Sequence, residues 1–149
     1  MKTELLNKFG PCGLSCEKCF AFHNSQIKIH AEQLKINLGE FDAYANRFVS
    51  LLEEPAFTKY PDFKEVLNVF AAGNCLGCRK QVCHLFQECK VRNCYKEKGV
   101  DYCYECEEFP CEKTGFDENL IQRWRNINQK IRKIGLENYY LEIMDRPRY

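Results

Sequence analysis

The sequence predicts a mostly α-helical fold, a small helical domain with cysteine-rich loops or knuckles that bind metal. Two observations predict this. Apolar residues recur every three or four positions over several long segments, which is the spacing of amphipathic helices. Eleven cysteines occur in 149 residues, and eight of them lie between Cys75 and Cys111, a density too local for ordinary core packing.

We expect one domain over residues 1–149, because a chain of this length is the size of one ordinary domain and can bury a sizeable core. In order, it would contain an N-terminal cysteine triplet, a helical scaffold over 25–73, a cysteine cluster over 75–111 and a C-terminal amphipathic helix over 117–135. No repeat or low-complexity segment interrupts this order.

Charge and hydropathy patterning exclude several functional classes. The formal net charge is +1, so no global attraction toward nucleic acid or an anionic membrane is expected, and any nucleic-acid contact would have to be local. The N-terminal segment MKTELLNKFGPCG has no long apolar run, and no stretch approaches the roughly 18 apolar residues of a membrane span. We therefore expect a cytoplasmic protein without a membrane partner, in which thiols stay reduced. The odd number of cysteines also disfavours a disulfide scaffold.

The first cysteine motif is the triplet Cys12-x3-Cys16-x2-Cys19. Its spacing resembles the [4Fe–4S]-binding triplet of radical S-adenosylmethionine enzymes, but those enzymes carry an aromatic residue before the last cysteine, where this chain has Lys18. We therefore interpret the triplet as three ligands of a closed four-coordinate site. The fourth ligand would be His23 or a cysteine from the later cluster, and otherwise His23 is a solvent-facing imidazole.

Three helices are expected between the triplet and the cluster, over 25–39, 41–52 and 61–73. Ser25 is a suitable N-cap for the first, and Gly39 is a suitable stop. The second ends before a proline and the third begins at one. Aromatic-rich stripes at helical spacing predict that the three helices pack as a scaffold core.

The cluster contains two C-x2-C pairs, Cys75/Cys78 and Cys103/Cys106. A C-x2-C pair turns the chain so that both sulfurs point at one ion while backbone N–H groups face the thiolates, and Gly77 suits that turn. Four further cysteines surround the pairs, namely Cys83, Cys89, Cys94 and Cys111.

Between the two pairs, residues 84–98 predict a short or broken helix that stops at Gly99. Cys89 and Cys94 lie five positions apart, which does not place them on one face of a regular helix. If both bind metal, the helix must be interrupted there.

The last long helix, over 117–135, would be capped by Asp117 and stopped by Gly135. Its expected buried stripe is Leu120, Ile121, Trp124, Ile127, Ile131 and Ile134. The opposite face is cationic, which we interpret as a solvated face in preference to a contact for phosphate or an acidic partner. The tail after 135 also has a helical pattern.

All the cysteines are candidate metal ligands: Cys12, Cys16, Cys19, Cys75, Cys78, Cys83, Cys89, Cys94, Cys103, Cys106 and Cys111. The later eight could fill two four-cysteine sites. Alternatively, Cys75, Cys78, Cys89 and Cys94 form one site, and Cys103, Cys106 and Cys111 form a second with an N-terminal cysteine, leaving Cys83 as a small buried hydrophobe.

Zinc is the expected metal, and an iron–sulfur cluster is the alternative. Both accept thiolate ligands. Zinc is favoured because glycine-containing C-x2-C knuckles are typical of zinc ribbons, while the spacings differ from the C-x2-C-x2-C run of ferredoxins.

The order of the motifs resembles a family of cysteine-rich bacterial and archaeal proteins catalogued as a domain of unknown function. The resemblance rests on the N-terminal triplet, on the later motifs CLGCR, CKVRNC, KGVDYCYEC and FPC, and on the terminal Pro147-Arg148-Tyr149. What it implies is a prokaryotic cytosolic protein that binds metal.

From these residues we expect a cysteine-rich binding or adaptor module with structural zinc, whose partner is a protein. An iron–sulfur electron-transfer protein is the alternative. A metalloenzyme with an open metal site is less favoured, because no H-E-x-x-H, phosphate loop, dinucleotide fingerprint or G-x-S-x-G element is present.

Overall fold

The structure is a computed structural model and describes residues 2–149. Within that range it contains seven α-helices, two short 3-10 helices and no β-strand, so the predicted mostly α fold class is confirmed. The only extended pairings among these residues are two isolated β-bridges. None of the described helices is long and apolar enough to cross a membrane.

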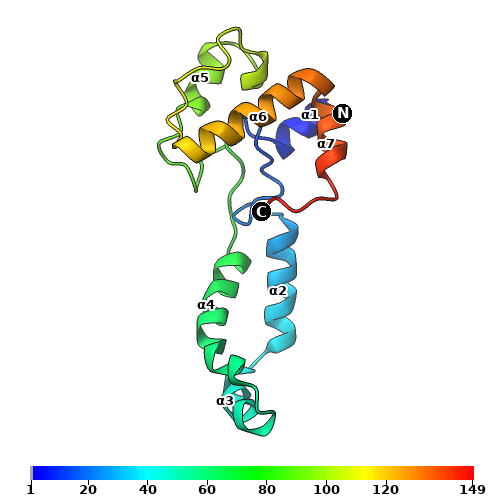
Figure 1. Cartoon of the computed structure of the whole chain (residues 1–149), viewed down its shortest axis with the longest axis vertical. Coiled ribbons are helices and arrows are strands. Elements are labelled where there is room, and N and C mark those ends of the chain that lie inside the picture. The colour runs from blue at the N-terminus through cyan, green and yellow to red at the C-terminus, as the bar shows by residue number, and fades with distance from the viewer. Residues whose placement is uncertain (1) are drawn as a thin grey trace.

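The molecule consists of a head and a long helical arm (Figure 1). The head contains α1 (Lys2–Lys8), α5 (Val91–Glu97), the 3-10 helix η2 (Cys103–Glu105), α6 (Glu118–Ile134) and α7 (Leu136–Ile143). The arm contains α2 (Gln26–Leu38), α3 (Asp42–Leu51), the 3-10 helix η1 (Pro55–Lys59) and α4 (Tyr60–Ala71). In the arm, α2 and α4 run side by side and α3 lies at the far end, while the C-terminus lies where arm and head meet (Figure 1).

The three arm helices begin and end within two residues of their predicted bounds. Ser25 is the N-cap of α2, and its hydroxyl accepts a hydrogen bond from the backbone N–H of Lys28 at 3.1 Å. At the other end, Gly39 donates its backbone N–H to the Lys35 carbonyl. These caps satisfy backbone groups that a helix terminus leaves unpaired, which is why they mark the boundaries.

The arm packs as a scaffold core in two places, an aromatic cluster of Phe41, Phe48, Phe57 and Tyr60 at its far end and the contact between α2 and α4. Ala31, Leu67 and Ala71 are buried there. By contrast, Leu51 is 62% exposed and Val66 is 52% exposed. The reason is geometrical, because each arm helix has few neighbours and its apolar stripe is wider than the face that those neighbours cover.

Helix α6 forms the centre of the head. Asp117 caps it as predicted, accepting from the backbone N–H of Leu120 at 2.9 Å. Within the predicted stripe, Trp124 and Ile131 are almost completely buried. The sequence pattern missed Asn128, a polar residue that is also fully buried and donates to the main-chain oxygens of Cys12 and Trp124, both at 2.8 Å.

Helix α1 was not predicted. Its Leu5, together with Phe9 just after the helix, packs against Ile131 and Tyr139 in a second cluster of the head core. With seven residues, α1 is too short for apolar periodicity to be apparent, and contacts distant in sequence stabilise it.

The loop before α6 requires glycine at position 115. Gly115 has φ +72°, and a Cβ there would lie 2.5 Å from the main-chain oxygen of Glu88. Gly99 has a similar φ of +63° but has open space around the corresponding position. We expect Gly115→Ala to lower the free energy of unfolding by about 2–4 kcal/mol, from left-handed strain plus overpacking.

The matched control is Gly99→Ala, which introduces left-handed backbone strain without overpacking. It should lower the free energy of unfolding by about 1 kcal/mol. Urea unfolding followed by circular dichroism measures both. If both variants lose the same free energy of unfolding, the close approach of residue 115 to the Glu88 main-chain oxygen is not a constraint.

Candidate metal centre

The neck between arm and head joins the N-terminal triplet to the first C-x2-C pair. Cys75 donates its backbone N–H to the Ala21 carbonyl at 2.8 Å, and its own carbonyl accepts from His23 N–H at 2.9 Å. This bridge brings two segments about fifty residues apart in sequence into contact, and their cysteines therefore share one region.

Seven cysteines line a single small cavity of about 40 Å³ in this region, and we call them the seven-cysteine group. They are Cys12, Cys16, Cys19, Cys75, Cys78, Cys83 and Cys89. The cavity has room for an ion or a water molecule. No aspartate or glutamate is among the described residues that line it, so sulfur is its main donor.

Within this group, Cys78 contacts two other thiols, those of Cys16 and Cys83. Hydrogen bonding with Cys78 lowers the pKa of Cys16 to about 7 and the pKa of Cys83 to about 6. The same two contacts raise the pKa of Cys78, so Cys78 retains the proton while its neighbours ionise. Thiolate is the form of cysteine that binds metal, and this trio provides it near neutral pH.

Backbone N–H groups face the sulfurs of this group, as the C-x2-C pattern predicts. Gly77 has φ +92° and donates its N–H to Cys75 Sγ at 3.4 Å. Burial raises the pKa of Cys89, and the backbone N–H groups of Val91 and Arg92 act in the opposite direction by stabilising the thiolate.

The remaining cysteines, Cys94, Cys103, Cys106 and Cys111, form a second set that we call the four-cysteine group. Burial raises the pKa of Cys94, and the thiolates of Cys111 and Cys106 raise it further. Burial likewise raises the pKa of Cys103 to about 12, while Cys111, Cys94 and Cys106 again act as neighbouring charges. Three of the four, Cys103, Cys106 and Cys111, pack against the hydrophobic cluster around Trp124, which also contains Cys12 of the seven-cysteine group.

The core and a buttressing arginine surround the four-cysteine group. The indole N–H of Trp124 lies near Cys103 and acts to lower its pKa, against the effect of burial. Among the described residues, Trp124 Nε1 is buried and has no acceptor at full hydrogen-bond geometry. Arg132 donates to the main-chain oxygens of Tyr104 at 2.6 Å and Cys106 at 2.8 Å. Arg132 lies on the face of α6 predicted to be solvated, but its side chain forms structural contacts with the segment that carries Cys106.

Neither group is arranged as a ready coordination shell. In residues 2–149, no three or more His, Cys, Asp or Glu side chains are positioned to hold a metal ion together. All eleven cysteines are free thiols. The structure therefore fits a thiophilic metal in the type and number of its donors, and rotation about Cα–Cβ bonds would be needed to direct the sulfurs at a common ion.

The grouping differs from the second partition considered from the sequence. Cys94 lies with Cys103, Cys106 and Cys111, and not with the first C-x2-C pair. Cys83 contacts Cys78 and lines the cavity, so it is not an isolated buried hydrophobe. The short helix predicted within residues 84–98 is present as α5, which begins at Val91, so Cys89 lies before the helix and Cys94 within it.

His23 and His84 have different positions. His23 is exposed and lies beside Phe22, with 4.7 Å between ring centroids, and it does not line the seven-cysteine cavity. His84 does line that cavity, although no sequence pattern distinguished it from the other histidines. Its position directly after Cys83 is the signal that could have indicated this.

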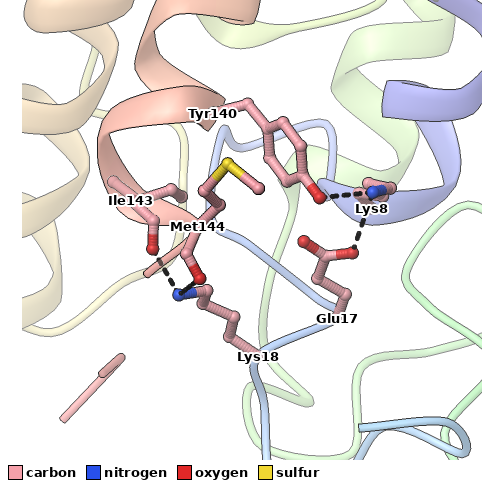
Figure 2. A network of polar contacts seen from close by, with 6 residues as sticks. All are labelled: Lys8, Glu17, Lys18, Tyr140, Ile143 and Met144. Atoms are coloured by element: carbon pink, nitrogen blue, oxygen red, sulfur yellow. Dashed lines mark hydrogen bonds and ion pairs between the residues drawn. The ribbon is translucent and has the colours of Figure 1, made fainter. Parts of the chain in front are cut away.

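The C-terminal tail is the part of the site that sequence reasoning missed. Lys18, within the cysteine triplet, donates to the main-chain oxygens of Ile143, Met144 and Arg146 at the end of α7. Nearby, Lys8 contacts Tyr140 and Glu17, so two N-terminal lysines hold α7 against the triplet (Figure 2).

These contacts bring the last residues of the tail to the cysteines. Arg148 donates to the main-chain oxygen of Ser15, and the Tyr149 hydroxyl lies 3.9 Å from Cys19 Sγ. The Pro147-Arg148-Tyr149 ending thus covers one side of the seven-cysteine group.

Comparison with known proteins gives one match. A family model described as "Protein of unknown function (DUF3795)" matches residues 8–116, a span that includes every cysteine of both groups. No curated protein and no solved structure matches the chain. Since the match covers well over half of the chain, this protein belongs to the DUF3795 family of proteins of unknown function.

Proposed function

We propose that this chain is a cytoplasmic metal-binding protein whose cysteine groups hold structural zinc, and that it acts as a binding or adaptor module for a partner protein. The observation that carries the proposal is the gathering of all eleven free thiols into two sets, one of seven and one of four. Zinc accepts all-thiolate coordination and is four-coordinate in structural sites.

The four-cysteine group has the number of thiols that one closed zinc site requires. The seven-cysteine group has more than one tetrahedral ion needs, so it would hold a second zinc with sulfurs in reserve or two ions that share ligands. In either case the metal would hold together the triplet, the first C-x2-C pair and the segment up to Cys89.

The proposed partner is a protein because the arm offers apolar surface. Leu51, Leu52 and Val69 are each more than half exposed. They lie on and just after α3 and on α4, and exposed apolar side chains gathered on one part of a protein are more typical of an interaction surface than of a solvated helix.

The test is an elemental analysis with an ultraviolet–visible spectrum on protein purified without oxygen and without added metal. We expect at least two zinc per chain and a colourless solution. The double variant Cys94→Ser/Cys106→Ser should lose about one zinc, while His23→Ala should retain the full content because His23 lies outside the cavity.

Two outcomes contradict the zinc proposal. Protein that retains no metal and does not take up zinc on titration would exclude a metal-binding role. Iron with acid-labile sulfide and a broad absorption near about 400 nm would establish the iron–sulfur alternative, with electron transfer as the function to test next.

A further inference from the structure

A cleft of about 810 Å³ lies along the N-terminal half of α6, between α7 and the C-terminal tail, and we call it the tail cleft. Its volume is in the range of pockets that hold small organic ligands. Ser15 and Arg148 line both this cleft and the seven-cysteine cavity. The two are therefore separated by a single wall.

The tail cleft is cationic. Its lining includes four basic side chains, from Lys18, Arg123, Arg146 and Arg148, and one carboxylate, from Glu118. The basic residues come from three different parts of the chain: the triplet, α6 and the tail.

Among residues 2–149, these four basic side chains are not paired with carboxylates in salt bridges. Three of them donate to neutral main-chain oxygens: Lys18 Nζ to Met144 O at 2.8 Å, Arg123 Nη2 to Arg148 O at 3.1 Å, and Arg148 to Ser15 O. Such contacts orient the side chains but leave the positive charge available to an anion.

The wall shared with the cysteines contains donors that lack an acceptor. In the described structure, Ser15 Oγ and Arg148 Nε are buried and have no hydrogen-bond partner. A buried donor without a partner is costly, so an acceptor at this wall would stabilise the site. The floor beside it is apolar and includes Leu14, Ile127 and Ile143.

We propose that the tail cleft binds a small organic anion, with a carboxylate or phosphate group against Arg123, Arg146 and Arg148 and an apolar portion against the floor. The surplus of positive charge in the cleft predicts a negatively charged ligand. The apolar floor predicts an organic molecule rather than an inorganic ion. This site is distinct from the proposed metal ligands and does not depend on which metal they hold.

The test uses the full chain as purified and calorimetric titration with three probes: phenyl phosphate, benzoate and neutral benzyl alcohol. We expect saturable binding of at least one of the two anions, weakened by added salt, and no saturable binding of benzyl alcohol. The stronger of the two anions identifies the preferred head group.

Two variants locate the site. Arg146→Gln removes a cleft charge whose side chain makes no polar contact in the described structure, and we expect it to weaken anion binding at least about fivefold. Arg47→Gln, on α3 of the arm and outside the cleft, is the matched control and should leave the affinity unchanged.

Three results would overturn the proposal: no saturable anion binding up to about 10 mM, equal affinity for benzyl alcohol, or binding unchanged in both Arg146→Gln and Arg123→Gln. Failure here leaves the metal proposal untouched, because elemental content is measured separately. Conversely, protein that contains no metal and takes up no zinc but still binds the anion would support the cleft proposal and contradict the zinc proposal.

Discussion

Trp124→Ala is expected to lower the free energy of unfolding by about 3–5 kcal/mol, the usual range for removing a large buried aromatic side chain. Trp124 is completely buried at the middle of α6. Its ring meets Phe109 edge-on with centroids 4.9 Å apart, and it meets Phe116 at 6.5 Å. Alanine would leave a cavity between α6 and the loops that carry the four-cysteine group.

Urea unfolding followed by far-ultraviolet circular dichroism is the appropriate measurement, since Trp124 is the only tryptophan of the chain and its fluorescence disappears in the variant. Tyr44→Ala removes an aromatic side chain that is 53% exposed on the arm, and it should cost less than about 1 kcal/mol. A cost below about 1 kcal/mol for Trp124→Ala as well would contradict the central position of this residue in the core.

Removal of metal is expected to have a still larger effect on the head. In small zinc domains, apparent metal-binding free energies are about 10–16 kcal/mol and are largely folding free energy. The head core consists of small hydrophobic clusters, and one of them includes Cys12. Without ions between the sulfurs, we expect the loops over 75–90 and 99–116 to lose their fixed positions and α6 to lose its neighbours.

The measurement is thermal unfolding followed by circular dichroism, with and without a zinc chelator, after elemental analysis has shown that the metal has been removed. We expect the midpoint of unfolding to fall by more than about 10 °C, since even a few kcal/mol shifts the midpoint of a chain this size by that amount. Chelator that is saturated with zinc beforehand is the control. An unchanged midpoint in verified metal-free protein would exclude a structural role for metal.

Local signals in the sequence were sufficient for most helices. Ser25, Asp117 and Gly135 act on backbone groups within four residues of themselves, so their positions predict the ends of α2 and α6. The prediction was correct there because capping is a short-range interaction. Helix α1 lacked such a signal, since its stability depends on Ile131 and Tyr139, more than a hundred residues away.

The grouping of the cysteines could not be predicted for a similar reason. The spacing of Cys75 and Cys78 indicates that they act together, but nothing in the sequence near Cys94 shows that its neighbours are Cys103, Cys106 and Cys111. Likewise, Lys18 lies inside a cysteine motif, but its acceptors are main-chain oxygens of Met144 and neighbouring residues. Contacts of this kind depend on the path of the whole chain.

The hydrogen-bonded neck gives the arm a mechanical property. The arm begins and ends at adjacent points, because Cys75 pairs with Ala21 and His23 where both segments enter the head. A force on the distant end near α3 would be transmitted along two antiparallel helices, α2 and α4, to this junction (Figure 1). Cys19 and Cys75 lie there, in the same sulfur-lined cavity. Both ends of the arm therefore meet beside the thiols, and a force on the arm would act first on the segments that carry Cys19 and Cys75.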